Sequence, residues 1–172
     1  KKSGTFKIIN TGSHFQYYES DHPNPLNLYA QTKQTFANNL AEFSREQGLN
    51  FVNLIIYESY GPRDWRKKLF QAIAHNQRSA EIMPMVASDP VMDFAHIDDI
   101  VDAYIHAAFL LERCPEDVNG QSYALSGGER RHISEIIKYF EEIGKKRIIT
   151  EKKEDLPDVK RVLNPWKGPI LP

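Results

Sequence analysis

A tyrosine and a lysine, Tyr29 and Lys33, stand four residues apart in a stretch with the pattern of a helix. Residues at this spacing lie one turn apart on the same helix face. A free phenol has a pKa of about 10 and is a poor acid or base near neutral pH. A nearby ammonium group stabilises the phenolate and lowers that pKa, which lets tyrosine transfer a proton. Taken alone, the pair fits either a proton-transfer site or a solvated helix face.

Polar segments that follow apolar ones frame this pair. Asn10-Thr11-Gly12-Ser13 ends a predicted strand, and the Ser13 hydroxyl is suited to hydrogen-bond a carbonyl oxygen. A second predicted strand ends at Tyr57 and leads into Glu58-Ser59-Tyr60-Gly61-Pro62. Further on, Asp93-Phe94-Ala95-His96-Ile97-Asp98-Asp99 precedes a predicted helix. The context therefore favours the chemical interpretation of the Tyr–Lys pair.

The apolar pattern predicts strands and helices that alternate along the chain. The predicted strands are 5–12, 50–57, 82–86, 91–95, 121–126 and 147–150. The predicted helices are 26–47, 66–77, 99–112 and 133–143. This alternation predicts an α/β fold with a largely parallel sheet.

Two helices have an apolar face that can be specified in advance. In helix 26–47, which Gly48 ends, the predicted apolar face is Leu28, Thr32, Phe36, Leu40 and Phe43. In helix 99–112, which Asp98 is expected to cap, the predicted inner face is Ile100, Ala103, Tyr104, Ala107 and Leu111.

Composition limits the class of protein. The 172 residues are 41% hydrophobic and 26% charged, with a net charge of −1. These values are typical of a globular domain, and they give no electrostatic reason to expect nucleic acid or an anionic membrane as a partner. No apolar run is long enough to cross a bilayer. The single cysteine, Cys114, excludes an internal disulfide and is consistent with a reducing compartment such as the cytoplasm.

Other candidate sites are weaker. The six histidines lack metal-ligand spacing, so we expect no metal site. The acidic group Asp98, Asp99 and Asp102 is best explained as charge that complements a helix dipole. The basic stretch from Arg63 to Lys68 fits a phosphate contact or a solvated loop equally well. No glycine-rich phosphate loop occurs in the sequence.

Four motifs together resemble a known family. They are 11–18 (Thr-Gly-Ser-His-Phe-Gln-Tyr-Tyr), 24–34 (Asn-Pro-Leu-Asn-Leu-Tyr-Ala-Gln-Thr-Lys-Gln), 57–62 and 93–99. Their order and spacing resemble the extended short-chain dehydrogenase/reductases, the NAD-dependent epimerase/dehydratase family that acts on nucleotide sugars. Motifs 11–18 and 24–34 look most like the reductases that make CDP-linked 3,6-dideoxyhexoses such as abequose and paratose.

The resemblance implies a fold and a domain division. The chain would be the C-terminal part of a Rossmann-type doubly wound parallel sheet plus a small α/β substrate-binding lobe. Residues 1–60 would belong to the NAD(P)-binding domain. Residues 61–172 would be mainly the substrate lobe, with 91–126 returning to the first domain. The family's glycine-rich half would precede residue 1, which makes the chain look like an internal fragment.

The resemblance also implies catalytic roles. Tyr29 would be the acid/base, and Lys33 would bind the nicotinamide ribose and lower the Tyr29 pKa. Ser13 would hydrogen-bond the reacting sugar oxygen. Thr11 would lie beside it at the cofactor, and His96 and Asp98 would be mainly structural.

Binding roles follow in the same way. The remaining contacts with the cofactor, NAD or NADP, would come from Tyr57, Glu58 and Ser59. The backbone of these residues would lie near the nicotinamide. Besides Ser13, the substrate contacts would come from His14, Arg63, Arg66 and Lys67.

Four positions depart from the family pattern. Dehydratases carry an Asp-Glu pair where this chain has His14 and Phe15, which argues against 4,6-dehydration. Met92 stands where many relatives have an arginine for the substrate diphosphate. Glu58 stands where relatives often carry Asn or Asp, so contacts there are in doubt.

The implied function is an NAD(P)-dependent nucleotide-sugar 4-ketoreductase acting on a 4-keto-6-deoxy or 3,6-dideoxy sugar, as in O-antigen and lipopolysaccharide biosynthesis. The alternatives are a 4-epimerase of the same family, and a non-catalytic sugar-nucleotide-binding module or truncated product. The expected partners are a nucleotide-diphosphate sugar and a second copy of the chain. The homodimer would form through the Tyr29 helix and helix 99–112.

Overall fold

Three parallel strands carry the residues of chemical interest. A computed structural model describes residues 7–66, 68–86, 89–153 and 167–172. Strands β1 (Lys7–Ser13), β2 (Asn50–Ile56) and β6 (Ser122–Leu125) form a sheet in the order β1-β2-β6. Both strand pairs are parallel. The interior of β2 is buried throughout, as expected for a strand covered on both faces.

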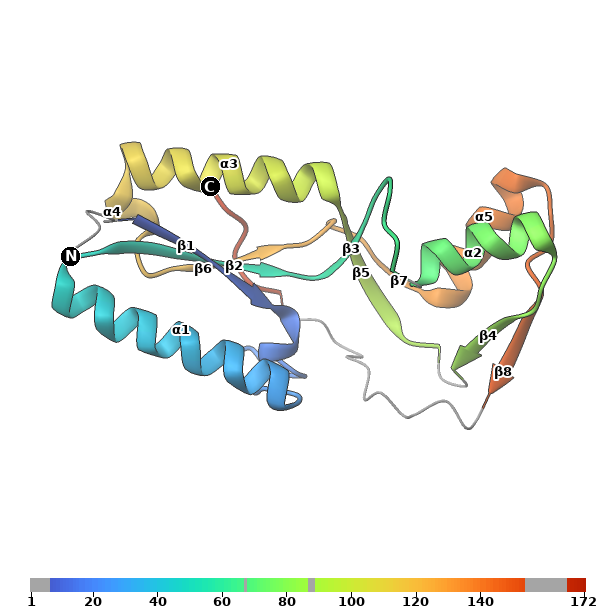
Figure 1. Ribbon diagram of the computed structural model, residues 1–172, viewed down its shortest axis with the longest axis horizontal. Coiled ribbons are helices and arrows are strands. Elements are labelled where there is room, and N and C mark those ends of the chain that lie inside the picture. Colours follow the sequence, from blue (N-terminus) through green and yellow to red (C-terminus); the bar gives the residue numbers. More distant parts are fainter. Residues whose placement is uncertain (1–6, 67, 87–88, 154–166) are drawn as a thin grey trace.

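Helix α1 (Leu28–Gln47) covers one face of this sheet and helix α3 (Ile97–Arg113) covers the other (Figure 1). A short 3₁₀ helix, η1 (His14–Gln16), directly follows β1, and a four-residue helix, α4 (Pro115–Val118), follows α3. The predicted homodimer through these two helices stays a prediction.

Helix α1 starts and stops as its sequence predicts, but it buries a different face. Asn27 caps it by accepting from the Ala30 N–H at 3.0 Å, and Gly48 ends it with φ 64°. The buried positions are Ala30, Ala37, Leu40 and Ser44. Small alanines let the helix backbone approach the sheet closely, which turns the large side chains outward.

The predicted apolar face of α1 is consequently wrong except at Leu40. Leu28, Phe36 and Phe43 are 73%, 55% and 48% exposed, and Thr32 is exposed as well. Among the described residues, none buries Leu28, Phe36 and Phe43, which form an exposed apolar stripe on α1.

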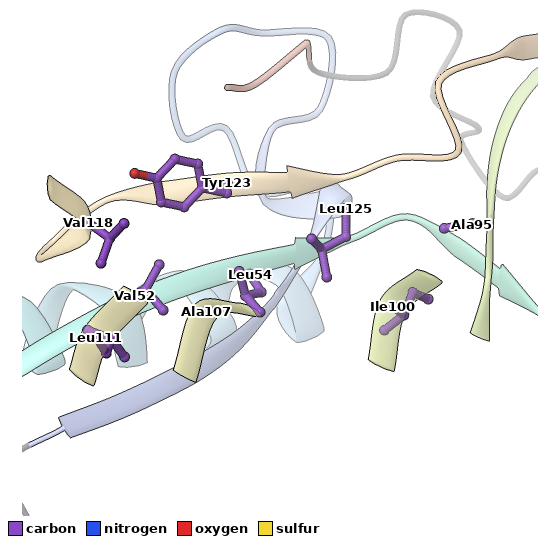
Figure 2. Close-up of a cluster of buried hydrophobic side chains, with 9 residues drawn as sticks. All are labelled: Val52, Leu54, Ala95, Ile100, Ala107, Leu111, Val118, Tyr123 and Leu125. Atoms are coloured by element: carbon purple, nitrogen blue, oxygen red, sulfur yellow. The ribbon is translucent and has the colours of Figure 1, made fainter. Parts of the chain in front are cut away.

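Helix α3 buries the face that was predicted. Ile100, Ala107 and Leu111 are buried, and Ala103 and Tyr104 pack against them half-buried. The cap is different: the His96 side chain, not Asp98, accepts the Asp98 N–H. The resulting core, shown in Figure 2, consists of Val52, Leu54, Ala95, Ile100, Ala107, Leu111, Val118, Tyr123 and Leu125.

A second region extends from the end of β2 (Figure 1). Strand β3 (Glu58–Tyr60) pairs in parallel with β5 (Val91–His96), and β5 pairs in antiparallel fashion with β7 (Arg130–His132). Strand β4 (Met83–Val86) pairs in parallel with β8 (Thr150–Lys153). Helices α2 (Leu69–Ser79) and α5 (Ile133–Gly144) pack on these strands around Ile73, Met83, Ile133, Ile136, Ile137 and Ile148.

The α/β prediction is confirmed, although the strands form three small sheets instead of one. All described strand pairs except β5–β7 are parallel. Strands β3 and β7 were not predicted, because three residues are too few for a pattern and β7 reads Arg-Arg-His. The last strand begins at Thr150, where the prediction ended. The domain boundary at residue 60 stays a prediction.

Candidate active site

Lys33 connects the helix that carries Tyr29 to the end of β1. The Lys33 ammonium donates to the Thr11 backbone carbonyl at 3.0 Å and lies 6.0 Å from the centre of the Tyr29 ring. A cation at this distance is attracted by the ring face. Tyr29 itself is 53% exposed. The sequence pair is thus one unit, with an anchored lysine and a phenol that an incoming molecule can reach.

Ser13 is held in place by its own turn and by α1. It is buried, it is the last residue of β1, and its hydroxyl accepts the Phe15 N–H at 3.3 Å. The Gln16 side-chain oxygen accepts the Ser13 N–H at 2.8 Å, while the Gln16 amide donates to Gln34 of α1 at 2.9 Å. These bonds tie the serine to the helix that carries Tyr29 and Lys33.

Gly12 explains why this turn can be so close to the sheet. A Cβ at this position would lie 2.4 Å from the Ile55 Cδ1 and 2.8 Å from the Gln16 Oε1. Only glycine fits between them without moving a buried neighbour. Gly12 was not singled out in the sequence, although it precedes Ser13 in the motif.

The carbonyl and the hydroxyl of Thr11 both form contacts within the protein. Its carbonyl binds Lys33, and its hydroxyl contacts the Tyr104 hydroxyl of α3. Burial raises the pKa of Tyr104, so this phenol stays neutral. The cofactor contact expected of Thr11 stays a prediction.

His14 is a neutral imidazole beside Ser13. It is buried, and its Nδ1 lies 3.3 Å from the Ile56 carbonyl oxygen. Since a carbonyl only accepts, Nδ1 carries the hydrogen and Nε2 is left as an acceptor. Burial lowers the pKa of His14 below 6.5, against the opposing charges of Glu58 and Asp93. His14 is therefore suited to accept a hydrogen bond from a hydroxyl group.

The segment after β2 uses its side chains internally. Tyr57 is buried, and its ring stacks on His14 with centroids 5.2 Å apart. The Glu58 carboxylate pairs with Lys68 at 2.7 Å, and the Ser59 hydroxyl accepts from Arg66 at 3.2 Å. Any contact of this segment with a cofactor would therefore come from its backbone.

The basic stretch divides between two places. Arg66 forms a two-pronged pair with Asp64, with both contacts at 2.7 Å, and this lowers the pKa of Asp64 to about 2. Arg63 is exposed in a turn with φ 64°. Arg63 and Arg66 border a hollow of about 190 Å³, and the substrate contacts expected of them stay a prediction. Lys67 lies outside the described residues.

A larger cavity of about 500 Å³ lies between α2, β4, β5 and α5. Its walls include all three methionines of the chain, Met83, Met85 and Met92. Lys68 and Glu58 line it as well. This cavity was not predicted. The one sequence feature that could have indicated it is the presence of three methionines within ten residues.

One polar atom in this region lacks a partner. The Gln71 side-chain oxygen is buried and has no hydrogen-bond partner among the residues that the structure describes. Gln71 also lines the large cavity. An orphaned buried acceptor costs free energy, so a ligand with an N–H or O–H donor suits this wall.

The residues present fit one end of a dinucleotide cofactor. An ammonium group has three donors, and the described contacts of Lys33 use one of them, at Thr11. The others are available to ribose hydroxyls, next to the reachable Tyr29 phenol. No glycine-rich loop for the pyrophosphate occurs in this sequence. The fit is therefore limited to the nicotinamide–ribose end.

No described helix is long and apolar enough to cross a membrane. No group of three or more His, Cys, Asp or Glu side chains is placed to hold a metal ion within that part of the chain.

This fold and this Ser–Tyr–Lys arrangement define a class of protein. The chain belongs to the NAD dependent epimerase/dehydratase family, whose model matches residues 2–124. A curated relative is CDP-abequose synthase from Yersinia pseudotuberculosis, 28% identical over 101 residues. The match covers 58% of this chain and 35% of the relative. The family prediction is thus confirmed.

Solved structures share the fold. UDP-glucuronic acid 4-epimerase from Bacillus cereus has a TM-score of 0.76 at 21% identity, covering 88% of this chain and 49% of that one. The dTDP-glucose 4,6-dehydratase from Streptomyces venezuelae has a TM-score of 0.79 at 18% identity, covering 97% and 53%. Both were solved with NAD bound. This chain spans about half the length of these proteins.

Proposed function

We propose that this chain carries the catalytic residues of an NAD(P)-dependent nucleotide-sugar 4-ketoreductase. The observation that carries the proposal is the unit at the end of β1, where Lys33 is anchored beside a reachable Tyr29 phenol. The similarity to CDP-abequose synthase supports reduction. So do His14 and Phe15, which replace an acidic pair that dehydration would need.

The residues act on the carbonyl oxygen of the sugar. Bound NAD(P)H supplies the hydride for C4 of the ketone. The Tyr29 hydroxyl donates its proton to the oxygen, while Ser13 donates a hydrogen bond to the same atom. The positive charge of Lys33 stabilises the phenolate that Tyr29 becomes. The His14 Nε2 accepts a hydrogen bond from a neighbouring sugar hydroxyl.

The large cavity is suited to the nucleotide part of the substrate. Lys68 provides positive charge for a diphosphate, the methionine and phenylalanine walls suit a base, and Gln71 offers an acceptor to a base N–H group. Both cations are already paired, Lys68 with Glu58 and Arg66 with Asp64. We propose Lys68 as a diphosphate contact ahead of Arg66 because Lys68 lines this cavity and Arg66 does not.

A 4-epimerase is the second candidate, because UDP-glucuronic acid 4-epimerase shares the fold over 88% of this chain. An epimerase oxidises and then reduces the same carbon, so it consumes no cofactor overall. A binding module without catalysis is the third, and it would bind CDP or UDP sugars without converting them.

The deciding experiment measures cofactor oxidation by the full natural protein with a CDP-4-keto-3,6-dideoxyhexose. We expect NAD(P)H consumption equal to product formed, and a loss of about 1,000-fold in turnover for Tyr29→Phe. Tyr139→Phe, which changes another exposed tyrosine, should retain full turnover. Wild-type turnover in Tyr29→Phe would refute the reductase assignment. Interconversion of C4 epimers without net consumption would favour the epimerase.

We also propose a cytoplasmic homodimer. The free cysteine Cys114 is consistent with a reducing compartment. The exposed stripe Leu28, Phe36 and Phe43 on α1 supports an interface on that face alone. Light scattering should report a dimer that Phe36→Glu converts to a monomer, and a monomeric wild type would remove the dimer from the proposal.

A further inference from the structure

A buried carboxylate lies where the β1-β2-β6 sheet meets the cavity region. Asp93 of β5 is only 3% exposed. Its oxygens accept from the Ser126 hydroxyl at 2.7 Å and from the Gly127 N–H at 3.0 Å. The Arg130 Nε lies 3.5 Å from Oδ2, the oxygen that accepts from Ser126. Asp93 thus fastens the connection between β6 and β7.

Arg130 contacts Tyr57 as well as Asp93. It stands directly opposite Asp93 in the β5–β7 register, and its guanidinium also donates to the Tyr57 phenol oxygen. Burial and the nearby Asp93 charge raise the pKa of Tyr57, which keeps the phenol neutral. An arginine can bridge two acceptors in this way because its donors are fixed in a planar fork.

Tyr57 contacts Arg130 on one side and His14 of the candidate active site on the other. Its ring lies nearly parallel to that of His14, at an interplanar angle of 10°. His14 is fixed at its other end by the Ile56 carbonyl, and it follows Ser13 directly. A continuous set of contacts therefore runs from β7 through Arg130, Tyr57 and His14 to the serine.

We propose that Arg130 is a positioning residue that orients His14 beside Ser13 by holding the Tyr57 ring. The ion pair with Arg130 is not needed to satisfy the carboxylate, which already has two hydrogen-bond donors in Ser126 and Gly127. Buried ion pairs contribute little net stability compared with apolar replacements, so a geometric role explains the arginine better than a stabilising one. Because β7 leads into α5, this link couples the cavity region to the reacting end. That coupling rests on the proposed function, whereas the orientation of His14 does not.

The test uses the imidazole NMR signals of the full natural protein with labelled histidine. The His14 signal is the one that His14→Gln removes. We expect Arg130→Met to shift this signal, because the Tyr57 ring changes position and with it the ring current at His14. The matched control is Arg131→Met, the next residue of β7, which is exposed and paired with Glu129. It should leave the His14 signal unchanged.

A double-mutant cycle separates positioning from general destabilisation. Tyr57→Phe keeps the stacking ring and removes the acceptor, so it should shift the His14 signal as Arg130→Met does. In the Tyr57→Phe background, Arg130→Met should add no further shift. If Arg130→Met does not fold, Tyr57→Phe alone carries the test. An unchanged His14 signal in a folded variant overturns the proposal, as does a shift that is fully additive.

The kinetic consequence is measured separately. We expect Arg130→Met to lower kcat about 10-fold while KM changes less than about twofold, because a displaced catalytic group affects the reacting step. Arg130→Lys should recover little, since a point charge cannot bridge Asp93 and Tyr57. Unchanged kcat together with a shifted His14 signal would refute the coupling. Absence of turnover in the wild type would count against the proposed function alone, because the NMR result needs no turnover.

Discussion

Two hydrophobic clusters of the described residues differ in construction. The cluster under α3 is aliphatic apart from Tyr123, and Val52, Leu54 and Ala107 in it are completely buried (Figure 2). The cluster between α2 and α5 includes Met83 and encloses a cavity of about 500 Å³. The first holds the strand that ends at Ser13 in one place. The second leaves room for a ligand, with flexible thioether side chains that can adapt to it.

Truncating one buried residue in each cluster tests this contrast most directly. Leu54→Ala should reduce the free energy of unfolding by about 4 kcal/mol, because the packed sheet cannot close over the space. Met83→Ala should cost only about 2 kcal/mol, since Met83 already faces a cavity and loses fewer contacts. Urea unfolding monitored by circular dichroism measures both. Equal losses would mean that the two clusters are packed alike.

The junction between the clusters should be almost as sensitive as the sheet core. A Cβ on Gly127 would lie 1.8 Å from the Phe94 carbonyl oxygen, so Gly127→Ala forces two backbone segments apart. We expect a loss of about 3 kcal/mol in unfolding free energy. The control is Gly128→Ala, where nothing lies within 4 Å and only the positive φ of 85° opposes a side chain, at about 1 kcal/mol. A tolerated Gly127→Ala would contradict the close approach of β5 to the β6–β7 connection.

The cavity region should respond in binding more than in stability. Lys68→Met removes the positive charge and leaves Glu58 unpaired beside the cavity, so CDP should bind about 10-fold more weakly. Lys138→Met, on the exposed face of α5, is the matched control. Isothermal titration with CDP measures both. Unaltered CDP affinity in Lys68→Met would place the diphosphate elsewhere.

The smallest effect concerns pH. Burial lowers the pKa of His14 below its ordinary value of 6.5, so the unfolded chain takes up a proton at higher pH than the folded one. The stability that depends on neutral His14 is therefore complete above 6.5 and is lost as the pH falls below it. Between about pH 7.5 and 5.5, the wild type should lose more in Tm than His14→Gln does. The exposed His22→Gln should behave as the wild type, and identical pH profiles for all three would argue against a buried His14.

Local patterns predicted correctly what depends on local geometry. The Tyr29–Lys33 pair shares a helix face because its spacing is one turn, and β2 is buried because nearly every residue in it is apolar. The cap of α3 was predicted at Asp98, directly before the predicted helix 99–112. The helix begins at Ile97 instead, so His96 is the residue that caps it.

Other features depend on segments that are distant in the sequence. The buried face of α1 was mispredicted because the sheet selects Ala30 and Ala37 over the larger residues that periodicity favours. Lys68 pairs with Glu58, and Arg66 pairs with Asp64. The positions of these residues along the chain do not predict which basic side chain pairs with which carboxylate.

Residue types at fixed separations along the chain predicted the α/β class and place Tyr29 and Lys33 on one helix face, and the resemblance of four motifs predicted the family. The catalytic roles of Ser13, Tyr29 and Lys33 stay a prediction. The tertiary structure alone decided which helix face is buried, where the cavity lies, and how Arg130 reaches His14 through Tyr57. Those properties depend on contacts between residues dozens of positions apart, such as Asp93 with Arg130. No local pattern encodes contacts of that range, since they exist only once the backbone has been brought together.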